Sequence, residues 1–138
     1  MKEIKVLLIE KNVPYAKVLT KLLEEDFNFN FNIKHFEELS KGFTELVTSG
    51  IDIALLDISQ TDCVWLDTVK KIKFNTPYLP IIFLTETSHH SFTKYGAEVM
   101  QNFLVKEQFD SKLLVNTILN AVEHQLALKR LSKHLVKG

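Results

Sequence analysis

The sequence predicts an α/β fold in which helices cover both faces of a parallel sheet. Short apolar segments alternate with longer amphipathic segments along the 138 residues. Several of the short segments are almost continuously apolar, which is typical of strands that are buried on both faces. Neither a Pro- or Ser-rich linker nor an internal repeat interrupts this alternation, so we expect a single domain.

Five strands are expected. The first, third and fourth are the apolar segments, whereas the second alternates and places Phe31, Ile33 and His35 on one side. That alternation indicates an edge strand. In chain order, the predicted strands are Lys5–Ile9, Asn30–Phe36, Ile51–Leu56, Ile81–Leu84 and Asn102–Val105.

Amphipathic helices are expected between and after these strands. The first carries Val18, Leu19, Leu22 and Leu23 on one stripe, as a helix packed on a sheet would. The predicted helices are Tyr15–Glu25, Glu37–Thr48, Val64–Lys73, Ser91–Met100 and a long one from Ser111 toward Leu135.

The last helix should be longer than the sheet beneath it, because about 25 residues at about 1.5 Å each reach nearly 40 Å. We therefore expect a domain over residues 1–127 and an overhanging helical tail over 128–138. The tail either frays or, as we favour, forms a coiled-coil segment that dimerises or leads to an output domain. The stripe expected on the sheet is Val115, Ile118, Leu119 and Val122. A second register runs through Leu114, Thr117, Ala121, His124, Leu128, Leu131 and Leu135.

Composition excludes several classes of function. The formal net charge is zero, which argues against non-specific electrostatic binding of nucleic acid. The single cysteine, Cys63, leaves no internal disulfide framework and fits a cytoplasmic protein. No apolar stretch approaches the roughly 18 residues of a membrane-spanning helix, and no Gly-rich phosphate loop is present.

Four polar residues follow the predicted strands, where parallel strands place their functional crevice. Glu10 follows the first strand, Asp57 the third, Thr85 the fourth and Lys106 the fifth. A carboxylate beside a hydroxyl and an ammonium is the set that phosphoryl transfer to a carboxylate requires. The sequence therefore predicts a phosphoryl-accepting pocket at this edge of the sheet.

The same segments carry a family resemblance. The motifs VLLIEKN, DIALLDISQTD, LPIIFLTE and NFLVKEQFD resemble, in order and spacing, those of the receiver domain of two-component response regulators, over roughly residues 4–127. The resemblance implies a flavodoxin-like three-layer sandwich with a doubly wound sheet of strand order 2-1-3-4-5. It also implies a cytoplasmic phosphorelay module, which is a signalling protein and not an enzyme. The implied partner is a sensor histidine kinase or a phosphotransfer protein.

Roles for individual residues follow from the resemblance. Asp57 would be the phosphoacceptor, Thr85 the switch hydroxyl and Lys106 the lysine that pairs with the phosphoryl group. Phe103 falls at the aromatic switch position, although ordinary packing is the interpretation that we favour for an aromatic residue there. The resemblance also implies Mg²⁺, held by Glu10, Asp57 and the backbone carbonyl of Ser59.

Lys11 departs from the family pattern because it stands at the second acidic position, which binds the metal directly. A unit charge about 4 Å from another contributes about 4 kcal/mol at an effective dielectric of about 20, so an inward Lys11 should weaken Mg²⁺ binding. A competing hypothesis is that Lys11 replaces the cation and pairs with Asp57 and Glu10.

Two other functions stay open at this point. The main alternative is a phosphorylation-independent pseudo-receiver, with a pocket locked by Lys11 and Glu86, that acts as a protein-interaction or dimerisation module. A flavodoxin-like domain that binds a small molecule is disfavoured, because the loops after the strands are short and charged.

Overall fold

The computed structural model describes residues 3–48, 50–58, 64–86 and 102–137, which form five strands and four helices. The predicted helix Ser91–Met100 lies outside the described residues. The strands are β1 (Glu3–Ile9), β2 (Asn30–Phe36), β3 (Ile53–Asp57), β4 (Ile81–Thr85) and β5 (Asn102–Val105). The helices are α1 (Val13–Glu24), α2 (Leu39–Thr48), α3 (Val64–Asn75) and α5 (Ser111–Lys137).

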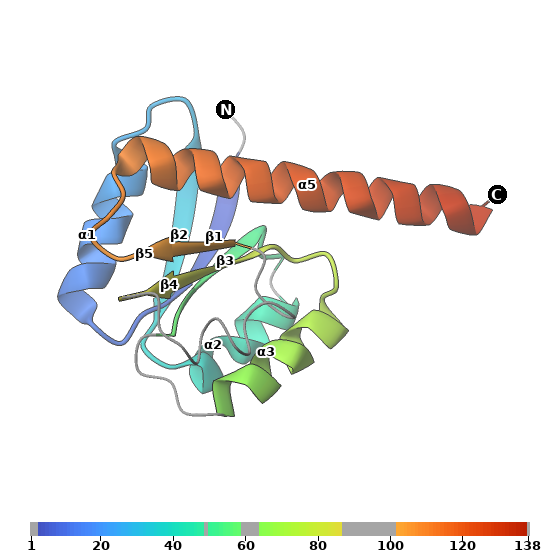
Figure 1. Cartoon of the computed structure of the whole chain (residues 1–138), viewed down its shortest axis with the longest axis horizontal. Helices are drawn as coiled ribbons and strands as arrows, with labels where there is room; N and C mark the ends of the chain where they lie inside the picture. The colour runs from blue at the N-terminus through green and yellow to red at the C-terminus, as the bar shows by residue number, and fades with distance from the viewer. Residues whose placement is uncertain (1–2, 49, 59–63, 87–101, 138) are drawn as a thin grey trace.

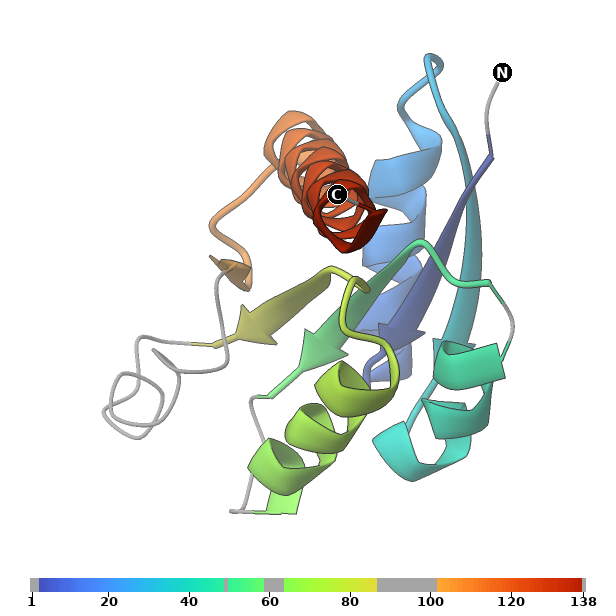
Figure 2. The same ribbon diagram turned by 90° about the vertical axis from the view of Figure 1, so that its right-hand side faces the viewer.

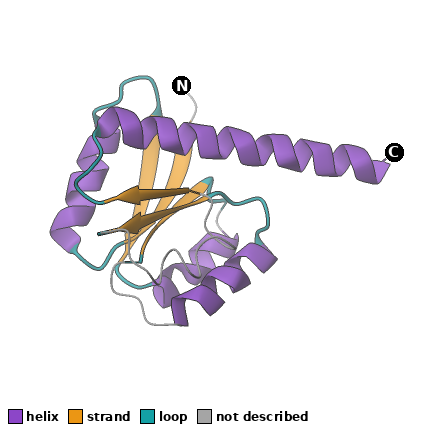
Figure 3. Cartoon of the chain, in the orientation of Figure 1, coloured by secondary structure: helices purple, strands orange, loops and turns teal. Residues whose placement is uncertain are grey.

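The five strands form one parallel sheet (Figure 3). The strand order is β2-β1-β3-β4-β5, which confirms the predicted topology. β2 lies at one edge, as its alternating pattern predicted, and β5 lies at the other. In β3 and β4 the residues are buried throughout except Asp57, the last residue of β3. Because all five strands are parallel, their carboxyl ends lie at the same edge of the sheet.

Helices cover both faces of the sheet, with α1 and α5 on one face and α2 and α3 on the other (Figures 1 and 2). Alternate side chains of β1 enter the two cores, because successive residues of a strand point to opposite faces. Val6 and Leu8 pack in the core under α1 and α5, whereas Leu7 and Ile9 pack in the core under α2 and α3. This layered packing fixes the strand ends that carry the candidate site.

α1 begins at Val13, two residues earlier than predicted. Asn12 is its N-cap, and the Asn12 side chain accepts a hydrogen bond of 3.0 Å from the backbone N–H of Tyr15. Proline lies in the first turn, where it removes no helical hydrogen bond. Val18 was wrongly placed on the buried stripe and is 50% exposed. The buried residues of α1 are Ala16, Leu19 and Leu23.

The other boundaries differ from the prediction by a few residues. α2 begins at Leu39 and not at Glu37, because the backbone carbonyl of Glu38 accepts the first helical hydrogen bonds. β3 begins later than predicted, at Ile53, and ends on Asp57.

α5 extends well past the sheet, as predicted (Figure 1). The stripe from Val115 to Val122 packs on the core as expected. The second register begins inside the domain, because Leu114 and Ala121 are buried in the same core. Further along, Leu128 and Leu131 are exposed, the latter to 60%.

Candidate functional site

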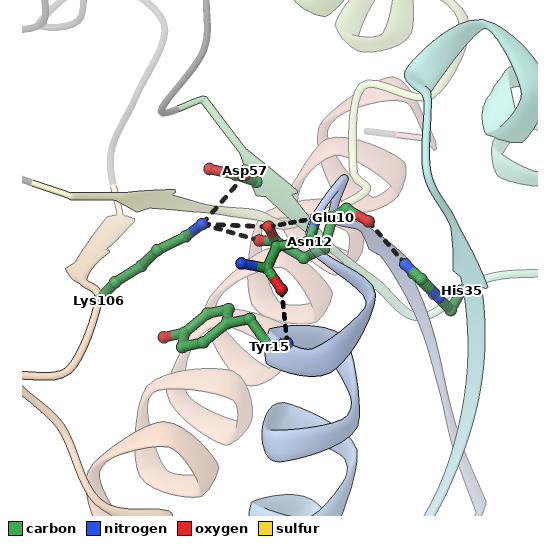
Figure 4. A network of polar contacts seen from close by, with 6 residues as sticks. All are labelled: Glu10, Asn12, Tyr15, His35, Asp57 and Lys106. Carbon is green, nitrogen blue, oxygen red and sulfur yellow. Dashed lines mark hydrogen bonds and ion pairs between the residues drawn. The ribbon is translucent and has the colours of Figure 1, made fainter.

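Three side chains from separate strands meet at the carboxyl edge of the sheet (Figure 4). Glu10 follows β1, Asp57 ends β3 and Lys106 follows β5. Because β1 and β3 are neighbours in the sheet, the two carboxylates lie side by side. Lys106 reaches both of them from the end of β5, so the structure brings together three of the residues that the sequence predicted.

The Lys106 ammonium bridges the two carboxylates. Its Nζ lies 3.1 Å from Oδ2 of Asp57 and donates a hydrogen bond of 3.1 Å to Oε1 of Glu10. It also lies 3.0 Å from Oε2 of Glu10, in an ion pair in which that oxygen accepts no hydrogen bond. The Lys106 side chain is only 10% exposed, so solvent screens these ion pairs far less than it would at the surface.

Glu10 is held rigidly at the end of β1. Its side chain is 1% exposed, and Oε1 also accepts a hydrogen bond of 3.1 Å from the backbone N–H of Asn12. Its backbone carbonyl accepts a hydrogen bond of 2.7 Å from Nε2 of His35, and its backbone N–H donates to the carbonyl of Phe36. The two contacts with β2 hold the backbone of Glu10 in place, and the hydrogen bond from Asn12 holds its carboxyl group.

Burial, the largest cause, and the hydrogen bond and charge of the neighbouring Asp57 carboxyl together raise the pKa of Glu10 to about 7. Hydrogen bonds from Lys106 and from the Asn12 backbone oppose the shift. Burial alone would lower the pKa of Lys106, but the hydrogen bonds and charges of Glu10 and Asp57 outweigh burial and raise it. The lysine is therefore a permanent cation, whereas Glu10 changes its charge near neutral pH.

Thr85 and Phe103 lie on β4 and β5, the two strands that follow β3 in the sheet. Thr85 is buried at the end of β4, and its backbone carbonyl accepts a hydrogen bond of 2.7 Å from the N–H of Lys106. Phe103 pairs with Phe83 across the two strands, and its side chain is 48% exposed. The exposure of Phe103 places an aromatic ring on the surface of an edge strand.

The structure rejects Lys11 as the cation of the pocket. Lys11 is exposed, and the ammonium that contacts both Glu10 and Asp57 belongs to Lys106. Successive residues of an extended chain point in opposite directions, so the residue after a buried Glu10 turns outward. Screening by solvent consequently removes most of the repulsion that an inward Lys11 would exert on a metal ion.

The donor atoms of this pocket are of the type that a divalent cation such as Mg²⁺ binds. Glu10 and Asp57 supply carboxylate oxygens, which Mg²⁺ prefers, and the buried Oε2 of Glu10 accepts no hydrogen bond. No cluster of three or more Asp, Glu, His or Cys side chains suited to a metal occurs within residues 3–48, 50–58, 64–86 and 102–137. Ser59, whose carbonyl the resemblance added as a ligand, lies outside the described residues.

Three contributors were missed by sequence reasoning. Nζ of Lys106 lies 4.8 Å from the centroid of the Tyr15 ring, Asn12 links the start of α1 to Glu10, and His35 holds the Glu10 backbone. The cap was detectable, because an Asn two residues before a Pro is typical of a helix start. The contacts of Tyr15 and His35 depend on tertiary structure and have no local signal.

Comparison with known proteins identifies the family. The family model for the response regulator receiver domain matches residues 6–119. The chain belongs to this family. Receiver domains are signalling modules of phosphorelay pathways. In this chain, two carboxylates and a lysine meet at the carboxyl edge of the sheet.

Solved structures share this receiver fold. A CheY-like receiver domain protein from Methanospirillum hungatei is 14% identical with a TM-score of 0.75, and the match covers 91% of this chain and 98% of that one. The receiver domain of a LuxO repressor protein from Vibrio parahaemolyticus is 17% identical with a TM-score of 0.75, covering 99% of both chains. NtrX from Brucella abortus is 14% identical with a TM-score of 0.76, covering 96% of this receiver but 29% of that longer chain.

A search of curated protein sequences found no significant match. Within the part of this receiver that the structure describes, no helix is long and apolar enough to cross a membrane.

Proposed function

We propose that this receiver accepts a phosphoryl group on Asp57 from a sensor histidine kinase or a phosphotransfer protein. The observation that carries the proposal is the Lys106 ammonium, which lies 3.1 Å from Oδ2 of Asp57 and is held there by Glu10. A cation fixed beside a carboxylate is already placed for the negative charge that the phosphoryl oxygens bring. The supporting family match covers most of the chain.

The transfer is a displacement at phosphorus. A carboxylate oxygen of Asp57 attacks the phosphorus of a phosphohistidine, the P–N bond breaks, and the imidazole leaves and takes up a proton. Lys106 neutralises the phosphoryl oxygens, and the Thr85 hydroxyl at the end of β4 hydrogen-bonds to one of them. A bound Mg²⁺, held by Glu10 and Asp57, would supply further charge neutralisation.

The phosphorylated state would reach the surface through β4 and β5. The backbone of Lys106 is hydrogen-bonded to Thr85, so a movement of Thr85 toward the phosphoryl group pulls on the end of β5. Phe103 lies on that strand with its ring half exposed. We infer that the partner-binding face changes at Phe103 and along α5, by a shift between two populated conformations.

A phosphorylation-independent pseudo-receiver is the second candidate. The specific observation in its favour is that Lys106 already neutralises the pocket, while the second acidic position holds the exposed Lys11. The two candidates differ in a direct experiment, which is incubation with a small phosphodonor and Mg²⁺ followed by intact mass. Addition of one phosphoryl mass to the native chain supports the receiver function. No addition to the native chain, together with addition to Lys11→Asp, supports the pseudo-receiver.

The overhang of α5 supports a homodimer. Leu128 and Leu131 are three residues apart on the helix, and both are exposed beyond the sheet. An isolated helix of a few turns is marginal in water unless its apolar face is covered. We therefore propose a domain over 1–127 and a tail over 128–138 that pairs with the tail of a second copy.

A further inference from the structure

Tyr15 is the third residue of α1, and its position is set by the start of that helix. Its backbone N–H is bound to the Asn12 side chain, and the Asn12 backbone N–H is bound in turn to Oε1 of Glu10. The Tyr15 side chain is partly buried and packs against the core under α1 and α5. The ring is therefore tied both to the core and to the carboxylate pocket.

The ring lies against the lysine of the pocket (Figure 4). Nζ of Lys106 is 4.8 Å from the ring centroid, within the range of a cation–π contact. The ammonium has a carboxylate partner on β1, a second on β3 and an aromatic face on α1. The lysine side chain is a flexible stem of four carbons. A contact from a third direction therefore restricts the position of the ammonium more than the two carboxylates do alone.

The hydroxyl of Tyr15 stays neutral at physiological pH. Burial, the largest cause, and the charges of Glu10, Glu107 and Asp57 together raise the pKa of Tyr15 to about 12, although a backbone hydrogen bond with Glu107 opposes the shift. The lysine therefore meets a neutral aromatic face and not a phenolate. A phenolate would compete with Asp57 for the ammonium, whereas the ring face does not.

We propose that Tyr15 is a positioning residue that holds the Lys106 ammonium between Glu10 and Asp57, and so sets the rate at which Asp57 accepts a phosphoryl group. The rate effect rests on the proposed function, whereas the effect on Lys106 does not. We attribute the positioning to the ring, which makes the contact with Nζ of Lys106, and not to the hydroxyl, whose hydrogen bond is with the backbone of Glu107.

The test compares Tyr15→Phe, which keeps the ring, with Tyr15→Leu, which removes it and keeps an apolar side chain. Phosphoryl transfer from a small phosphodonor is followed by intact mass. We expect Tyr15→Phe to react at the native rate within about twofold. We expect Tyr15→Leu to react about 5- to 30-fold more slowly, which corresponds to the loss of a cation–π contact of about 1–2 kcal/mol.

A second readout needs no phosphorylation. The NMR signal of the Lys106 ammonium protons is observable only while the ammonium is held in slow exchange with solvent. We expect this signal in the native chain and in Tyr15→Phe, and its loss or broadening in Tyr15→Leu. Assignment by Lys106→Arg, which removes the ammonium, completes the measurement.

Phe31→Leu is the matched control. Phe31 packs against the same core but lies opposite Ile4, near the start of β1 and far from the pocket. It should lose similar ring packing while keeping both the native rate and the ammonium signal. If Tyr15→Leu does not fold, Tyr15→Met takes its place, because Met fills an irregular gap without a ring.

The outcomes separate this proposal from the proposed function. An unchanged ammonium signal and an unchanged rate in Tyr15→Leu overturn the positioning role. An equal slowing of Phe31→Leu overturns it as well, because the effect would then come from packing. If the native chain accepts no phosphoryl group, the proposed function fails, and the ammonium signal alone decides the role of Tyr15.

Discussion

Nζ of Lys106 lies 3.0 Å from Oε2 of Glu10 and 3.1 Å from Oε1, although 96 positions separate the two residues in the chain. The contact joins the ends of β1 and β5, which are not neighbours in the sheet. It places a cation beside the carboxylate of Asp57, at the end of β3, one of the two strands between them.

Removal of the cation should destabilise the domain in a pH-dependent way. Lys106→Met leaves two buried carboxyl groups facing each other without a counterion, which costs about 2–4 kcal/mol at pH 8. The cost should shrink at pH 5, because Glu10 can then take up a proton. Urea unfolding of both chains at the two pH values measures the difference. An equal cost at both values would show that the charge of Glu10 is not coupled to Lys106.

Stability should fall as the pH rises through the titration of Glu10. The pKa of this carboxyl is about 7 in the folded chain and 4.5 in the unfolded chain, so the folded chain binds the proton more tightly. The stabilisation that the Glu10 proton provides is fully present below pH 4.5. It decreases by about 1–3 kcal/mol as the pH rises through about 7. Glu10→Gln keeps the shape without the titration. In metal-free buffer, we expect the difference in unfolding free energy between the native chain and this variant to change between about pH 4.5 and 7. A constant difference from pH 5 to 8 would refute the raised pKa of Glu10.

Mg²⁺ binding should be weak and should respond to position 11. The described part of the pocket offers two carboxylates, and an Asp at position 11 would add a third oxygen ligand. We expect Lys11→Asp to bind Mg²⁺ at least about tenfold more tightly in isothermal titration. Lys17→Asp makes the same charge change at another exposed lysine of the same region and should have little effect. Equal tightening by both variants would indicate a general charge effect.

The overhang of α5 should control the oligomeric state. Leu131→Lys adds a charge to the exposed apolar face of the helix, so it should shift the chain toward the monomer in sedimentation equilibrium. Asn120→Lys adds the same charge at an exposed position over the domain and should leave the association unchanged. A native chain that is monomeric at all accessible concentrations contradicts the proposed dimer.

The topology and the strand-end residues were predictable because both follow from local patterns. Alternation of apolar and amphipathic segments implied the parallel sheet, and the residue after each strand must then lie at its carboxyl edge. Asp57, Thr85 and Lys106 needed no further information. The edge position of β2 followed from its alternating side chains.

The errors arose where tertiary packing decides the outcome. Val18 fits the apolar stripe of α1, but the helix starts earlier and turns Ala16 inward instead. Lys11 stood at a ligand position, yet its direction depends on which side of the extended chain Glu10 occupies. The contact of Tyr15 with Lys106 joins α1 to the end of β5 and has no signal in either segment.

Phosphorylation of Asp57 would show in the mass of the intact chain after incubation with a small phosphodonor and Mg²⁺. We expect the native chain to gain one phosphoryl group, Asp57→Asn to gain none, and hydroxylamine, which cleaves acyl phosphates, to remove the added mass. A native chain without added mass, or an equal gain in Asp57→Asn, would contradict the proposal that Asp57 is the phosphoacceptor.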